Sequence, residues 1–278
     1  MRAWAASDSG LVRARNEDAY LVLDLADGLA CAVADGLGGM QAGEVAAALA
    51  MEVVREHLAG LRAGAGRAVL RDAIWAAHRR ILEVGRARRE LMASTLTLAV
   101  LSPGTVSIGH VGDSRAYLFR PDRAAPSPAG STPSAAPAGG GSTGTRSDAC
   151  VGKEGGVRPG TIRQLTRDHS RVGELLWRGA LTEAQARRHP QRHLLDQALG
   201  AGDLIEVDLI EVELQPGDIL LLCTDGLSGV VDSSEMAGIL AAGDLPLAPA
   251  RLVELANARG GPDNITVVVA EASWEDDR

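Results

Sequence analysis

Two apolar stretches that each lead into an Asp-Gly pair constrain this chain more than any other feature. Residues 29–34 (Leu, Ala, Cys, Ala, Val, Ala) are followed by Asp35-Gly36. Residues 219–223 (Ile, Leu, Leu, Leu, Cys) are followed, after one Thr, by Asp225-Gly226. An apolar run without polar alternation is typical of a strand that is buried on both faces. One such junction could simply carry Asp as a turn residue, but the near repetition favours a site built from strand-end carboxylates.

Other acidic residues occupy similar positions. Asp263 precedes the last apolar run, residues 265–270. If that strand runs antiparallel to the other two, Asp35, Asp225 and Asp263 meet at one edge of the sheet. Glu17 and Asp18 directly precede an expected strand over residues 19–23 and could join them.

Asp113 lies in a Val-Gly-Asp-Ser turn between expected strands 105–110 and 115–120. There it would sit at a hairpin tip, and on its own it would be a turn residue. Together, however, carboxylates without positive partners repel one another, so a bound cation is the simplest explanation. Oxygen ligands without His or Cys favour Mg²⁺ or Mn²⁺ over zinc, and several acids around a shared Asp suit a two-metal phosphatase. Arg13 would then supply a bidentate phosphate ligand.

The bulk composition excludes several classes of protein. A length of 278 residues allows one large domain or two small ones, and the net charge of -8 argues against a nucleic-acid binder. The three cysteines lack metal-ligand spacing and indicate a reducing compartment. No apolar run approaches the length of a membrane span, and the N-terminus lacks an apolar leader segment. We therefore expect a cytoplasmic protein without a membrane or nucleic-acid partner.

Residues 121–160 interrupt the regular pattern. They hold six of the twelve prolines among Ala, Gly, Ser and Thr, and almost no large apolar residue. Such a composition predicts disorder. Because 115–120 and 161–165 both have the composition of strands, we expect an insertion at a hairpin tip. Three histidines, His169, His189 and His193, have no ligand spacing and are expected at the surface or in caps.

Seven short motifs, in order and covering nearly all of the chain outside the insertion, resemble the protein phosphatase 2C family of metal-dependent serine/threonine phosphatases in its bacterial form. They are Arg13…Asn16-Glu17-Asp18, Val33-Ala34-Asp35-Gly36-Leu37-Gly38-Gly39, Ser94-Thr95-Leu96, His110-Val111-Gly112-Asp113-Ser114-Arg115, Leu165-Thr166-Arg167-Asp168-His169-Ser170, Thr224-Asp225-Gly226-Leu227 and Asp263-Asn264-Ile265-Thr266. The resemblance implies an α+β fold, a four-layer α/β/β/α sandwich of two antiparallel sheets flanked by helix pairs. It further implies one phosphatase domain over residues 1–278, with a mobile flap at about 171–195.

The resemblance also implies roles for single residues. Asp35 would bridge two Mn²⁺ or Mg²⁺ ions, the Gly36 carbonyl would bind one of them, and Asp225 and Asp263 would complete the shell of the other. Glu17 and Asp18 would hold metal-bound water, while Asp113 would help to bind a third, weaker ion. Arg13 would clamp the phosphate. The implied reaction is hydrolysis of phosphoserine or phosphothreonine in proteins by in-line attack of a metal-bridging water.

Two departures from the family pattern stand out. Some members carry His directly after the Asp-Gly pair as a proposed general acid, whereas this chain has Leu37. The usual Gly-Thr before the middle strand is Ala93-Ser94 here. Two alternatives remain open, a catalytically silent member that acts as a binding module and a hydrolase of another phosphoester. The expected partners are phosphoproteins and a cognate serine/threonine kinase, and we expect a monomer.

Overall fold

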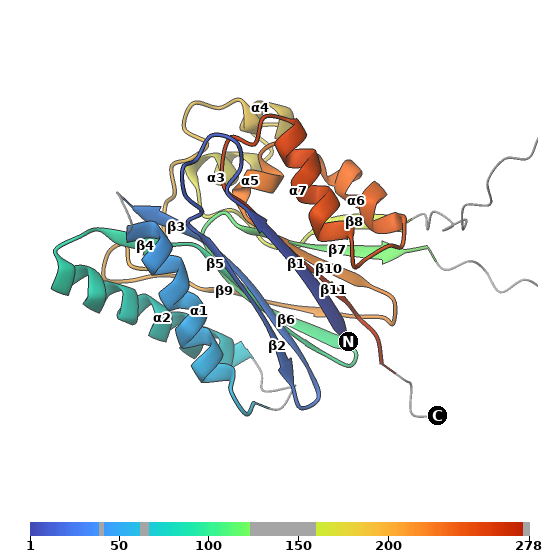
Figure 1. Ribbon diagram of the computed structural model, residues 1–278, viewed down its shortest axis with the longest axis horizontal. Coiled ribbons are helices and arrows are strands. Elements are labelled where there is room, and N and C mark those ends of the chain that lie inside the picture. Colours follow the sequence, from blue (N-terminus) through green and yellow to red (C-terminus); the bar gives the residue numbers. More distant parts are fainter. Residues whose placement is uncertain (39–41, 62–66, 123–159, 275–278) are drawn as a thin grey trace, which may run out of the picture.

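The computed structural model describes residues 1–38, 42–61, 67–122 and 160–274, and it has four layers (Figure 1). Two antiparallel sheets pack face to face, with helices outside each, which confirms the predicted sandwich. The strands are β1 (Arg2–Asp8), β2 (Asp18–Leu25), β3 (Gly28–Gly38), β4 (Met92–Ser94), β5 (Leu96–Ser102), β6 (Thr105–Val111), β7 (Arg115–Pro121), β8 (Gly160–Gln164), β9 (Asp208–Glu213), β10 (Ile219–Cys223) and β11 (Ile265–Glu271). The helices are α1 (Ala42–Leu58), α2 (Arg67–Arg88), α3 (Arg171–Trp177), α4 (Glu183–Arg187), α5 (Asp225–Ser228), α6 (Ser233–Ala241) and α7 (Ala248–Ala258).

The strand order brings distant parts of the chain together. The first sheet runs β1-β11-β10-β7-β8, and the second runs β2-β3-β5-β6-β9 with β4 paired to β3. Helices α1 and α2 cover the outer face of the second sheet, and α6 and α7 lie outside the first (Figure 1). Helices α3, α4 and α5 gather at one end of the sandwich, where the loops between the sheets also meet.

Burial on both faces explains why the central strands show no polar alternation. Alternate residues of β3 pack into two different cores. Leu29, Cys31 and Val33 join the core between the two sheets, whereas Ala30, Ala32 and Ala34 face α1 and α2. Strand β10 divides in the same way, with Leu220 and Leu222 between the sheets. The three described cores therefore fix β3 and β10 rigidly.

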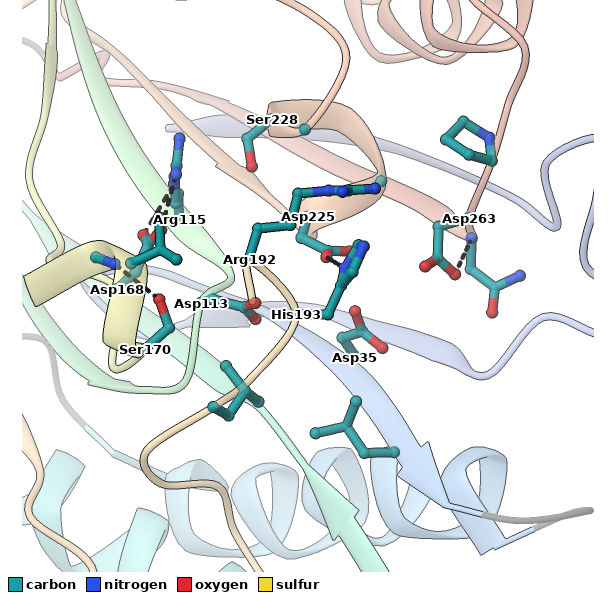
Figure 2. Close-up of a pocket in the computed structure, with 18 of the residues that line it drawn as sticks. Asp35, Asp113, Arg115, Asp168, Ser170, Arg192, His193, Asp225, Ser228 and Asp263 are labelled. Atoms are coloured by element: carbon teal, nitrogen blue, oxygen red, sulfur yellow. Dashed lines mark hydrogen bonds and ion pairs between the residues drawn. The ribbon is translucent and has the colours of Figure 1, made fainter. Parts of the chain in front are cut away.

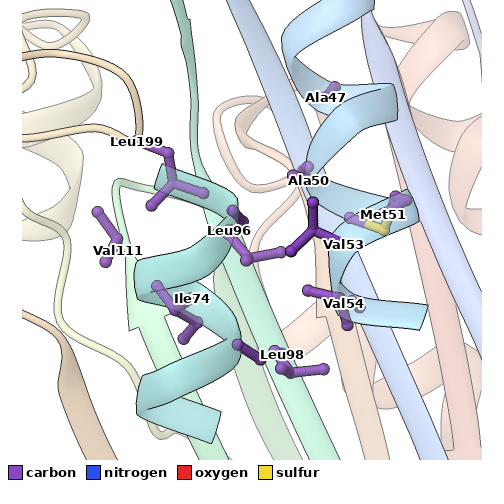
Figure 3. Packing of buried hydrophobic residues seen from close by; sticks show 14 of the residues in the cluster. Ala47, Ala50, Met51, Val53, Val54, Ile74, Leu96, Leu98, Val111 and Leu199 are labelled. Carbon is purple, nitrogen blue, oxygen red and sulfur yellow. The ribbon is translucent and has the colours of Figure 1, made fainter. Parts of the chain in front are cut away.

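Small side chains allow α1 and α2 to pack closely against the second sheet. On α1, Ala46, Ala47 and Ala50 are fully buried against the second sheet, together with Ala73 and Ala77 of α2. Figure 3 shows Ala47 and Ala50 on the inner side of α1, with Ile74 of α2 and Leu98 of β5 filling the neighbouring space. Alanine brings helix and sheet backbones close, so this core needs few aromatic residues.

The structure corrects four details of the predicted elements. Strand β3 does not end at Asp35 but continues to Gly38, because Gly36–Gly38 pair with β4. The segment after Cys223 forms the short helix α5. The alternation of apolar and acidic residues over 205–214 predicts a half-buried strand from residue 205, but the strand begins at Asp208. Asp113 is not at a hairpin tip, since β6 and β7 belong to different sheets and the turn between them crosses from one sheet to the other.

The β7–β8 pairing agrees with the position predicted for the insertion. Pro121 lies opposite Gly160 in an antiparallel register, so the chain leaves and rejoins the sheet at the same hairpin end. Residues 123–159 lie outside the described ranges, and their predicted disorder stays a prediction. Within the described ranges, the structure contains no helix both long enough and apolar enough to cross a membrane.

The first prediction concerns the core of Figure 3. Ile74 and Leu98 are fully buried in it, so Ile74→Ala and Leu98→Ala should each lower the free energy of unfolding by about 2–5 kcal/mol, through lost transfer energy and the remaining cavity. Leu204, with 82% of its surface exposed, is the control, and Leu204→Ala should change stability by no more than about 0.5 kcal/mol. Urea denaturation measures all three. Equal effects of the buried and exposed substitutions would contradict this packing.

Candidate active site

A cleft of about 590 Å³ opens at the end of the sandwich where α3, α4 and α5 gather (Figure 2). Seven of the eight residues predicted for the site line it: Arg13, Glu17, Asp35, Gly36, Asp113, Asp225 and Asp263. Asp18, the eighth, lies opposite Asp35 in the β2–β3 pairing. The structure therefore brings all eight residues together, although the sequence spacing separates them by up to 250 residues, as between Arg13 and Asp263.

The acids come from both sheets rather than from one edge of a single sheet, as the sequence had suggested. Asp35 comes from β3 of the second sheet, while Asp225 follows β10 and Asp263 precedes β11 in the first. Strands β10 and β11 are antiparallel neighbours, so the end of one lies beside the start of the other. Asp113 reaches the same place from the turn that crosses between the sheets.

The glycine of each Asp-Gly pair allows two backbones to touch. A Cβ on Gly36 would lie 2.1 Å from the Gly43 carbonyl oxygen, and one on Gly226 would lie 1.9 Å from the Asn264 carbonyl oxygen. Both distances are far below contact, so any side chain would force the segments apart. These glycines permit the loops that carry Glu17 and Asp263 to approach the strand ends.

Asn264 holds the loop that carries Arg13. Its side-chain oxygen accepts a hydrogen bond from the Glu17 amide (2.9 Å), and its side-chain nitrogen donates to the carbonyl oxygens of Ser9 (2.9 Å) and Arg15 (2.7 Å). The sequence placed Asn264 in a motif without assigning it a role. Its amide side chain fastens the β1–β2 loop to the start of β11.

Among the described residues that line the cleft, carboxylates outnumber cationic side chains. Burial raises the pKa of Asp35 well above its usual range, and the neighbouring charges of Asp18 and Asp225 raise it further. Burial followed by the charge of Asp225 does the same to the pKa of Asp113. Burial also raises the pKa of Asp18 to about 7, although the neighbouring Thr266 and Thr224 hydroxyls oppose the shift. Concentrated, desolvated carboxylates of this kind are stabilised by a cation.

The donor set fits a hard divalent ion. Asp18 Oδ1 and Asp225 Oδ1 are buried and have no hydrogen-bond partner among the described residues. Among the described residues, no three Asp, Glu, His or Cys side chains are grouped closely enough to hold an ion alone. An ion here must therefore take part of its shell from a backbone carbonyl, such as that of Gly36, and from water, which is usual for Mg²⁺.

Arg13 lies at the rim of the cleft. One of its terminal nitrogens donates to Asp263 Oδ2 at 2.8 Å, and the side chain is half exposed. A guanidinium has five N–H donors in a planar fork, so this single bond leaves donors available for a second oxyanion. The position is consistent with phosphate binding.

Comparison with known proteins agrees with this geometry. A model of the family described as "Protein phosphatase 2C" matches residues 12–254. The chain belongs to the protein phosphatase 2C family. The predicted family resemblance is therefore confirmed.

Individual relatives extend over almost the whole chain. The serine/threonine phosphatase stp of Listeria welshimeri is 33% identical over 279 residues, which cover 98% of this chain and 96% of that protein. The Ser-Thr phosphatase MsPP from Mycobacterium smegmatis, solved in complex with cacodylate, has a TM-score of 0.75 at 34% identity and covers 98% of this chain and 99% of its own. The catalytic domain of the phosphatase PstP, solved with two manganese ions, has a TM-score of 0.75 at 31% identity and 98% coverage of both chains.

The segment predicted to be the flap of this phosphatase contributes residues that the sequence had not assigned to the site. Arg187, Arg192 and His193 line the cleft, and His193 Nδ1 lies 3.9 Å from Asp225 Oδ2 (Figure 2). Arg187 forms an ion pair with Asp232, next to α6. The basic residues of this loop gave no signal for the site in the sequence, because only the fold places them beside the acids.

His169 was predicted at the surface or in a cap, and the structure corrects this. Only 9% of its side chain is exposed, with Nε2 3.1 Å from Asp208 Oδ2. Its main-chain nitrogen donates to the Gly112 carbonyl oxygen at 2.7 Å. Its ring lies against His110, with 4.8 Å between centroids, and so His169 supports the turn that carries Asp113.

His110 provides a pH prediction. Burial, and then the neighbouring His169, lowers the pKa of His110 to about 4, against about 6.5 in the unfolded chain. Between these values the unfolded state binds the extra proton, so stability is lost as pH falls from about 6.5 to 4, by up to about 3 kcal/mol. His110→Gln lacks the titrating ring and should lose correspondingly less. Denaturant unfolding at several pH values tests this: an unchanged gap between the two proteins would contradict it, because every other group titrates in both.

Proposed function

We propose that this phosphatase hydrolyses phosphoserine and phosphothreonine in proteins. The observation that carries the proposal is the cleft itself, whose described lining has more carboxylates, from both sheets, than cationic side chains, with Arg13 at the rim. Phosphate esters bind where metal ions and a guanidinium can neutralise their oxygens. The names of the relatives support a protein substrate.

We further propose two Mn²⁺ or Mg²⁺ ions in this cleft, with a third and weaker one. Asp35 would be shared by the first two, with the Gly36 carbonyl on one and Asp225 and Asp263 on the other. Glu17 and Asp18 would bind through water, and Asp113 would help to hold the third ion. When bound, such ions supply an activated water nucleophile and neutralise charge on the phosphoryl group.

The chain's own residues perform the remaining work. Arg13 would bind and orient the phosphate with the N–H groups that Asp263 leaves free. The Arg115–Asp168 pair, bonded at 2.8 and 2.7 Å, stiffens another wall of the cleft. Leu37 lines the cleft and its side chain is apolar, so position 37 offers no proton to the leaving group.

Other expectations also stand as proposals. We propose one phosphatase domain over residues 1–278, with the 171–195 segment as its flap. A monomer suffices, since one chain supplies every residue of the described cleft. A serine/threonine kinase is the natural opposing partner of such an enzyme. The free, buried thiols of Cys31 and Cys223 support a reducing, cytoplasmic location.

Substitution of Asp35 tests the proposed function. Asp35→Asn should reduce Mn²⁺-dependent hydrolysis of p-nitrophenyl phosphate by about 100-fold or more, because an amide is a much poorer ligand than a carboxylate. A chelator should abolish wild-type activity. Asp24→Asn, which changes an exposed acid on β2, is the matched control and should leave turnover unchanged. Full activity of Asp35→Asn would refute the assignment.

Turnover of p-nitrophenyl phosphate, a phosphothreonine peptide and a nucleotide separates the two alternatives. A silent binding module would show no metal-dependent turnover of any phosphoester. A hydrolase of another phosphoester would prefer a nucleotide to a phosphothreonine peptide.

Substitution of Arg13 tests the phosphate clamp. Arg13→Ala should raise KM for p-nitrophenyl phosphate by about 10- to 100-fold, the value of one charge-assisted hydrogen bond. Arg15→Ala removes an exposed cation two residues away and serves as the control. Steady-state kinetics at saturating Mn²⁺ measure both variants. An unchanged KM for Arg13→Ala would exclude the clamp role.

A further inference from the structure

The two carboxylate oxygens of Asp18 have different surroundings. Its Oδ2 accepts a hydrogen bond from the Thr224 hydroxyl at 2.8 Å, whereas Oδ1 is buried and has no hydrogen-bond partner in the part of the chain that the structure describes. In the β2–β3 pairing, Asp18 lies directly opposite Asp35. The orientation of this carboxylate is therefore set at the back of the proposed metal site.

Thr224 occupies a position where its side chain would normally cap a helix. It is the N-cap residue of α5, and threonine is favoured there because its hydroxyl accepts a bond from a helical amide. The Thr224 side chain makes no such bond. Its hydroxyl instead accepts a hydrogen bond from the Thr266 amide (3.0 Å) and donates to Asp18.

The direction of this chain of bonds is fixed. A backbone amide can only donate and a hydroxyl has one proton, so the Thr224 proton is committed to the carboxylate. Thr224 follows β10 and Thr266 belongs to β11, both in the first sheet, whereas Asp18 begins β2 in the second. The bond thus joins the two sheets at the residue next to Asp225.

We propose that Thr224 is a positioning residue for the metal site. Its hydroxyl, itself oriented by the Thr266 amide, fixes Oδ2 of Asp18 so that Oδ1 is left for an ion-bound water. The inference rests on the proposed function, because it gives Asp18 the water-holding role proposed there. The observation behind the proposal is that the Thr224 side chain, at the N-cap of α5, does not cap the helix but bonds to Asp18 in the other sheet.

The test compares Thr224→Val, which keeps the shape but loses the hydroxyl, with Thr224→Ser, which keeps the hydroxyl. Mn²⁺ binding to the metal-free protein is measured by calorimetry, and p-nitrophenyl phosphate kinetics and thermal unfolding are measured alongside. Thr224→Val should weaken Mn²⁺ binding by about 10- to 100-fold, the usual effect of losing a bond that orients a metal site. Thr224→Ser should bind Mn²⁺ as the wild type does.

Thr166→Val is the matched control. Thr166 is another buried threonine, and its hydroxyl accepts a bond from the Ala116 amide at 3.0 Å. This variant should lose stability but keep wild-type Mn²⁺ affinity, which separates positioning from general destabilisation. If Thr224→Val does not fold, Thr224→Ala replaces it in the same comparison.

Two results would overturn the inference. The first is that Thr224→Val binds Mn²⁺ with wild-type affinity. The second is that Thr224→Ser and Thr224→Val lose Mn²⁺ affinity equally. In either case a wild-type protein that still binds Mn²⁺ and hydrolyses the ester keeps the proposed function intact. A wild type that does neither refutes the proposed function, and this inference with it.

Discussion

The mutual repulsion of carboxylates at the meeting of two sheets is the constraint on which this structure depends. Asp35 and Asp225 lie beside strands buried on both faces, so neither can move away to relieve the repulsion. Burial, and then the charges of Asp18 and Asp225, raises the pKa of Asp35 well above its usual range, and a divalent cation would stabilise the charged form. The hydrophobic cores therefore hold the acids close together, and a bound divalent ion would offset their negative charge.

Beside the Arg13–Asp263 and Arg115–Asp168 pairs, uncharged groups make several of the supporting contacts around the acids. Asn264 ties the β1–β2 loop to β11, and Thr224 ties Asp18 across the sheets. The bare glycines Gly36 and Gly226 allow the backbones to come within reach. Neutral groups suit this task, because added cations would compete with the metal for the carboxylates.

Much of the fold could be predicted from residue patterns. The long helices α1 and α2 appear in the sequence as apolar residues at helical spacing, and β10 and β11 as apolar runs. Features that depend on partners far along the chain were harder to predict from the sequence. The extension of β3 depends on pairing with β4, and the burial of His169 depends on Asp208 and His110. Local sequence carries little signal for either, since the partner supplies the stabilising contact.

The sequence by itself determined which chemistry the protein could support. Strand-end acids, the glycines beside them and Arg13 can be identified without coordinates, because residue type and local pattern specify them. Only the tertiary structure decided that the acids come from two sheets rather than one edge, and that Asp113 reaches them from a turn between the sheets. It also showed that Thr224 bonds to Asp18 instead of capping α5. The physical reason is that sheet pairing joins residues as far apart as Arg2 and Glu271, 269 positions along the chain, whereas local pattern extends over only a few.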